Sequence, residues 1–72
     1  MAKKKTNRYR LVSNGMKIER SLNVDFCNNS TEKQIIREIL ICSGMFNTLE
    51  SYDYGFRTID LVPIRVHKKE EE

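Results

Sequence analysis

The residues best suited to chemistry in this sequence are cationic side chains near its start. They are Lys3, Lys4, Lys5, Arg8, Arg10, Lys17 and Arg20. Residues 1–20 carry a formal charge of +6, whereas residues 21–67 carry −2 and residues 68–72 carry −1. A concentrated positive charge attracts polyanions, because each neutralised phosphate releases counterions. The basic segment therefore predicts a nucleic-acid contact, and the alternative is an arm that only keeps the protein in solution.

A second group combines aromatic rings with an arginine, at Tyr52, Tyr54, Phe56 and Arg57. In an extended chain, alternate residues share one face, so the three rings would form a row. Aromatic rows beside arginine bind single-stranded nucleic acid by stacking on its bases. The competing interpretation is that these rings cover a small core.

Residues suited to catalysis or metal binding are few and scattered. His67 is the only histidine, and Cys27 and Cys42 form no C-x-x-C pair. A zinc site needs about four closely spaced nitrogen or sulfur ligands, and triad chemistry needs a base beside its nucleophile. The three glycines are isolated and form no phosphate-binding loop. We expect no enzyme activity, no metal and no small-molecule cofactor.

The composition also bears on location. The start Met-Ala-Lys-Lys-Lys has no apolar signal region, and no segment has the ~18 apolar residues of a membrane span. These features predict a cytoplasmic protein with reduced thiols and no membrane contact.

The elements that must position these residues begin with a β-hairpin. Tyr9–Ser13 and Met16–Arg20 alternate in polarity around Asn14-Gly15, a pair that favours a type I′ turn. A two-residue turn pairs Leu11 with Ile18 and Arg10 with Glu19. Apolar residues then oppose apolar residues, and opposite charges meet. The second strand is expected to continue as far as Phe26, with a bend near Ser21 as the alternative.

A helix is expected over about 31–43. Thr31 and Gln34 fit a capping box, and Gly44 can end the helix. One apolar arc contains Ile35, Ile36, Ile39, Leu40, Cys42 and Phe46, while Ile41 lies on the polar side.

The C-terminal part reads as a strand over residues 56–66. Its apolar phase changes at Val62-Pro63, which predicts a bulge that restores one inward face, or a strand that is apolar on both sides. Residues 45–56 read either as a loop or as another strand.

Together these elements predict a small two-layer α+β domain with one helix packed on the sheet. The order would be ββα(β)β, and if residues 45–56 form the additional strand it resembles a β-grasp arrangement. Residues 1–7 are expected to form a disordered basic arm, residues 8–66 the domain, and residues 67–72 a disordered charged tail.

One helix covers one sheet face, so the other face should be open to a partner. Candidate contact residues are Val12, Ile41, Val62, Ile64 and Val66. We expect a non-catalytic binding or regulatory module that acts through protein contacts, including self-association as a homodimer. The alternative is nucleic-acid binding by the basic arm and hairpin, with stacking on the aromatic row.

Overall fold

The computed structural model describes residues 5–66, and within them it contains three strands and three helices. In chain order these are β1 (Thr6–Ser13), β2 (Met16–Asn23), α1 (Val24–Asn28), α2 (Glu32–Cys42), α3 (Phe46–Asp53) and β3 (Asp60–Arg65). The predicted α+β class is confirmed. The β-grasp-like order required a strand within residues 45–56, and a helix lies there instead.

The strands form one antiparallel sheet in the order β2-β1-β3. The predicted hairpin register is confirmed, with Leu11 opposite Ile18 and Arg10 opposite Glu19. The predicted type I′ turn is wrong. Gly15 has a φ of 76°, but no other residue type in the described chain has a positive φ, so Asn14 stays in the ordinary region. Only the glycine, which adopts this conformation without steric cost, takes the left-handed position.

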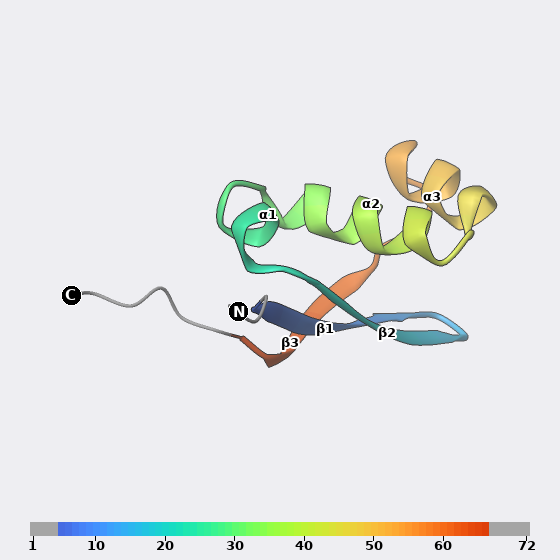
Figure 1. Cartoon of the computed structure of the whole chain (residues 1–72). Coiled ribbons are helices and arrows are strands. Elements are labelled where there is room, and N and C mark those ends of the chain that lie inside the picture. Colours follow the sequence, from blue (N-terminus) through green and yellow to red (C-terminus); the bar gives the residue numbers. More distant parts are fainter. Residues whose placement is uncertain (1–4, 67–72) are drawn as a thin grey trace.

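All three helices lie on one side of the sheet, as Figure 1 shows. The core between the layers consists of Tyr9, Leu11, Leu22, Cys27, Ile35, Ile36, Ile39, Leu40 and Ile59. Asn7 is also buried and donates from Nδ2 to the Tyr9 hydroxyl at 3.4 Å. Burial, followed by the hydrogen bond with Cys27, raises the pKa of Tyr9, so this hydroxyl stays protonated within the core.

The second strand ends earlier than its alternating pattern predicted. Asn23 caps α1, because its Oδ1 accepts hydrogen bonds from the backbone N–H groups of Asp25 at 2.7 Å and Phe26 at 3.4 Å. The prediction that the second strand continues to Phe26 is therefore wrong, because β2 ends at Asn23. A side chain that bonds its own following amides favours a helix start over a strand.

The predicted helix over 31–43 is confirmed as α2, including its capping box. Thr31 Oγ1 accepts a hydrogen bond from the backbone N–H of Gln34 at 3.2 Å, and Gln34 Oε1 accepts one from the backbone N–H of Thr31 at 2.9 Å. Gly44 follows with a φ of 73°, as expected for a helix stop. The inward arc is shorter than predicted, because Cys42 and Phe46 are exposed.

Residues 46–53, whose sequence shows no clear helix or strand periodicity, form α3, which packs against α2 (Figure 1). Its N-cap residue, Met45, makes no side-chain capping hydrogen bond. Leu49 and Tyr52 are half-buried against the core, and Arg37 of α2 forms an ion pair with Asp53 at 3.1 Å. Tertiary contacts with α2 thus hold a segment that lacks strong helix signals of its own.

The C-terminal strand, β3, is shorter than predicted and begins at Asp60. A register shift is present, since Tyr9 pairs with Pro63 whereas Arg8 pairs with Arg65. Ile64 is therefore the extra residue of a bulge. This bulge does not turn Val62 inward, because Val62 pairs with Arg10, away from the helices.

The predicted boundaries of the domain differ slightly from the described elements. β1 begins at Thr6, so Thr6 and Asn7 of the predicted arm belong to the first strand, and Asn7 is buried with Tyr9 in the core. Residues 1–4 of the predicted arm, with Lys3 and Lys4, lie outside the described residues. The same holds for His67 and the rest of the predicted tail.

Candidate functional site

The side of the sheet that faces away from the helices, here called the open face, carries most of the strand charge. Side chains alternate between the two sides of a strand, so every second residue lies on the open face and the residues between them face the core. The register then assigns the residues paired with one another to the same face, as for Arg10 and Glu19. The open face comprises Thr6, Arg8, Arg10, Val12, Lys17, Glu19, Ser21, Asp60, Val62 and Arg65.

Two arginines on the open face share one carboxylate. Arg10 donates from Nε to Glu19 Oε2 at 3.0 Å, and its Nη2 forms an ion pair with the same oxygen at 2.9 Å. Arg8 donates from Nη2 to Glu19 Oε1 at 3.3 Å. Arg8 also donates from Nη1 to Ser21 Oγ at 3.2 Å. The hydrogen bond from Arg10, helped by both positive charges, lowers the pKa of Glu19 below its usual range. Glu19 is therefore ionised at neutral pH.

A third arginine, Arg65 of β3, lies directly opposite Arg8 in the register. Like charges in facing positions repel each other across a sheet. The described part of the chain offers Arg65 no ion-pair partner, and Lys17 is likewise exposed without one. This end of the sheet thus carries more positive charge than its own carboxylate balances.

Charge is also divided between the two layers. The strands carry Arg8, Arg10, Lys17, Arg20 and Arg65 against Glu19 and Asp60, a net charge of +3. The helices carry Lys33 and Arg37 against Asp25, Glu32, Glu38, Glu50 and Asp53, a net charge of −3. Because Arg20 points toward the helices, the open face itself carries four cations against two anions, a net charge of +2. An anion therefore meets a favourable potential on the open face and an unfavourable one on the helix side.

The structure separates the cations that the sequence grouped together. Arg8, Arg10 and Lys17 share the open face, whereas Arg20 pairs with Tyr9 on the helix side and donates from Nε to Ser43 Oγ at 3.1 Å. Arg57 is bound to the hairpin tip, with Nη1 3.2 Å from Ser13 Oγ and 3.5 Å from the Asn14 carbonyl oxygen.

The predicted aromatic row does not form, because α3 runs through its first part. Tyr52 is half-buried in α3, whereas Tyr54 and Phe56 are 69% and 83% exposed just beyond it. The rings of Tyr54 and Phe56 lie 6.1 Å apart at an angle of 57°, with Gly55 between them at a φ of 83°. This pair belongs to the helix layer and not to the open face.

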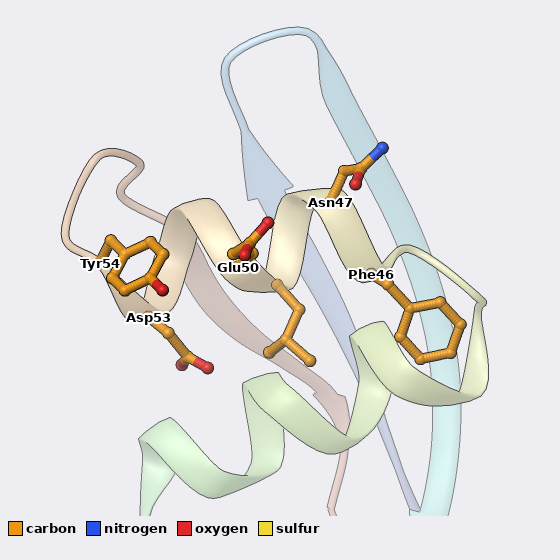
Figure 2. Close-up of a pocket in the computed structure, with 6 residues that line it drawn as sticks. Phe46, Asn47, Glu50, Asp53 and Tyr54 are labelled. Atoms are coloured by element: carbon orange, nitrogen blue, oxygen red, sulfur yellow. The ribbon is translucent and has the colours of Figure 1, made fainter.

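A hollow of about 410 Å³ lies on the surface of α3. It is lined by Phe46, Asn47, Leu49, Glu50, Asp53 and Tyr54. Figure 2 shows that Phe46 and Tyr54 lie at opposite ends of this helix, with Glu50 and Asp53 between them. Asp53 is already paired with Arg37, and no basic side chain lines the hollow.

The predicted interface residues do not form one patch. Val12 is half-buried and Val62 is exposed, and they are diagonal neighbours on the open face. Ile64 at the bulge and Val66 just beyond β3 are exposed, but neither has a partner in the register and neither belongs to the open face. Ile41 is exposed as predicted, but it lies on α2 in the other layer.

Glu19 and Arg65, the two charged residues beside Arg8 and Arg10 on the open face, are not among the residues predicted for the site, and neither are Thr6, Ser21 and Asp60. Glu19 could have been included from the sequence, because the predicted hairpin register already placed it opposite Arg10. Arg65 could not be placed beside Arg8 from sequence, because the bulge and the position of β3 next to β1 decide that pairing.

The cysteines are free and lie in different surroundings, since Cys27 is buried in α1 and Cys42 is exposed at the end of α2. Partial burial, followed by the neighbouring Glu38, raises the pKa of the Cys42 thiol. Residues 5–66 contain no group of three or more metal-ligating side chains. Within that range, no helix has the length and apolar character required to cross a membrane.

Comparison with known proteins gives no relative from which a site could be transferred. No protein-family model, curated protein or solved structure matches the chain. The open face therefore stands on its own geometry as the candidate site.

Proposed function

We propose that this protein is a small non-catalytic binding module that contacts nucleic acid through the open face of its sheet. The observation that supports this proposal is the excess of cations at one end of that face. Arg8, Arg10 and Arg65 meet there with Glu19 as the nearby carboxylate, and Lys17 extends the positive surface toward the hairpin tip.

The chemistry of these side chains favours a phosphate backbone as the ligand. Arginine presents a planar fork of donors that matches phosphate oxygens. The described residues of the open face include no aromatic ring, so this surface has no platform for base stacking. We therefore propose backbone recognition with little sequence preference.

Fluorescence anisotropy with labelled single- and double-stranded oligonucleotides of about 20 nucleotides tests this proposal. Binding is expected at ~50 mM NaCl and should fall steeply as salt is added, because each phosphate contact releases counterions. Undetectable binding to both forms at ~50 mM salt would overturn the proposal.

Two charge reversals with equal effect on net charge locate the surface. Lys17 lies on the open face and Lys33 on α2, and both are exposed without an ion pair among the described residues. Lys17→Glu should weaken binding by about fivefold or more, whereas Lys33→Glu should change it by less than about twofold. Equal losses would show that net charge alone governs the affinity.

A second candidate function is self-association, favoured by the aliphatic residues along β3. Val62, Ile64 and Val66 are exposed by 37–44%, and Val12 lies diagonal to Val62 on the open face. A second copy stacked on the open face would cover Val12 and Val62. Pro63 and the bulge make the free edge of β3 a poor site for strand addition, so we propose contact through the face.

The two candidate functions respond to salt in opposite directions. Face-to-face association brings Arg8, Arg10 and Arg65 of both copies together, so salt should strengthen it by screening their repulsion. Sedimentation velocity at low and high salt measures this effect. A strict monomer at all concentrations, with Val62→Asp leaving both assembly and stability unchanged, would remove self-association.

A further inference from the structure

We propose that Arg8, Arg10 and Arg65 form a binding site for a backbone phosphodiester, and that Glu19 acts as an internal competitor for this site. This inference deepens the proposed nucleic-acid function and rests on it. It assigns Glu19 a role in limiting affinity, which is distinct from a role in stabilising the sheet.

The first step of the argument is the way in which Glu19 is held. Its two carboxylate oxygens bridge two guanidinium groups, Oε2 to Arg10 at 2.9 Å and Oε1 to Arg8 at 3.3 Å. A phosphodiester offers two non-bridging oxygens that carry one negative charge and can accept in the same bridging manner. Glu19 thus occupies the position that a phosphate would favour.

The second step concerns the donors that remain. A guanidinium has about five N–H donors. Arg8 donates hydrogen bonds from Nη1 and Nη2, and Arg10 donates one from Nε with Nη2 in an ion pair, so each keeps unused N–H groups. The side chains of Arg8 and Arg10 are 47% and 37% exposed, which leaves these donors accessible to a ligand.

The third step is Arg65. It faces Arg8 across the sheet, and the described residues supply no carboxylate to pair with it. A bound anion between the two guanidinium groups would convert this repulsion into attraction. The alternative is that Arg65 only protects an edge strand from aggregation, since charged residues commonly do so. These two explanations differ in what removal of Arg65 does to nucleic-acid binding.

Glu19 limits binding in two ways under this proposal. It neutralises part of the positive charge of Arg8 and Arg10, and it repels the incoming phosphate. Glu19→Gln keeps the size of the side chain and one carbonyl acceptor while removing the charge. The variant should therefore bind more tightly.

The experiment compares Glu19→Gln with Glu50→Gln, which makes the same change in net charge on the exposed surface of α3. Each purified protein is titrated into a labelled oligonucleotide of about 20 nucleotides at several salt concentrations. At ~50 mM NaCl, Glu19→Gln should bind roughly fivefold or more tightly than the wild type. Glu50→Gln should stay within about twofold of the wild type.

Arg65→Gln gives a second readout and removes no ion pair of the described fold. It should weaken binding by about threefold or more and reduce the salt slope by about 0.9, with Lys33→Gln as the matched control. Thermal melts followed by circular dichroism verify that each variant is folded.

The outcomes separate the two proposals. If the wild type binds but Glu19→Gln and Glu50→Gln have the same effect, the competitor role is overturned and the nucleic-acid function stands. If Arg65→Gln binds like Lys33→Gln, the phosphodiester site is overturned. If neither the wild type nor Glu19→Gln binds either form of nucleic acid, both proposals fail.

Discussion

Ile39 and Ile41 lie two positions apart in α2, and they differ in burial. Ile39 is fully buried between the helix layer and the sheet, whereas Ile41 is 42% exposed on the outer side of the helix. The helical period of 3.6 residues causes this difference, because a step of two residues turns a side chain to the far side. Position, and not residue type, thus decides what each isoleucine contributes to stability.

This contrast predicts a large difference between two alanine substitutions. Ile39→Ala should lower the free energy of unfolding by about 2–5 kcal/mol, because it leaves a cavity in the core. Ile41→Ala should lower it by less than about 1 kcal/mol. Urea denaturation followed by circular dichroism measures both values. Similar losses in the two variants would contradict the placement of the core.

The cap of α2 gives a second prediction for a single residue. Thr31→Ala removes the oxygen that accepts from the Gln34 amide and should cost about 1 kcal/mol of unfolding free energy. Thr31→Ser keeps this oxygen and should cost clearly less. The same denaturation experiment compares them, and equal losses would show that the hydroxyl is not the stabilising group.

Glu19 predicts a defined pH dependence of stability. Its pKa in the folded state is lowered, chiefly by Arg10 and also by Arg8. Its ion pairs therefore contribute fully above the ordinary glutamate pKa, and this contribution is lost as the pH falls through the lower folded-state value.

Melting temperatures of the wild type and Glu19→Gln should accordingly differ at neutral pH and converge in acid. Glu50→Gln controls for the general effect of removing a carboxylate. A difference between the wild type and Glu19→Gln that stays constant across the acidic range would contradict this assignment.

At the scale of elements, α3 shows how packing against the neighbouring helix α2 can stabilise a helix whose own sequence has weak helix signals. Its start has no side-chain cap, and asparagine, threonine and tyrosine in its sequence are weak helix formers. The helix is held by Leu49 and Tyr52 against the core and by the exposed pair of Arg37 with Asp53. Exposed ion pairs contribute little, so apolar burial should dominate.

The prediction for α3 compares one contact of each kind. Asp53→Asn should lower the free energy of unfolding by less than about 1 kcal/mol. Leu49→Ala should lower it by about 1–2 kcal/mol, because a half-buried leucine loses its contacts with the core. Thermal and urea unfolding measure both variants, and a larger loss for Asp53→Asn would show that the ion pair holds the helix.

At the scale of the whole molecule, the division of charge between layers is the property that bears most on function. The strands carry +3 and the helices −3, while the exposed aromatic pair of Tyr54 and Phe56 belongs to the negative layer. If a nucleic acid binds to the open face as proposed, these rings do not belong to its binding surface.

It follows that Tyr54→Ser and Phe56→Ser, alone or combined, should leave oligonucleotide affinity within about twofold of the wild type. Anisotropy titrations at the same salt as for the charge reversals measure this. A large loss of affinity in these variants would place the nucleic acid on the helix side and would contradict the open face as the binding surface.

Features that depend on neighbours along the chain could be predicted from the amino-acid sequence alone. The hairpin register followed from alternation around Asn14-Gly15, and α2 with its capping box followed from helical period and the Thr31–Gln34 spacing. Both are local, because the hydrogen bonds and side-chain pairs that define them join residues close in sequence.

Features that depend on contacts between distant segments could be established only from the folded structure. The helical state of residues 46–53 requires the surface of α2, which no pattern inside that segment reveals. The pairing of Arg65 with Arg8 requires β3 to lie beside β1 with a bulge at Ile64. The candidate site arises in this way, since its three arginines come from strands at the two ends of the chain, and only their pairing brings the charges together.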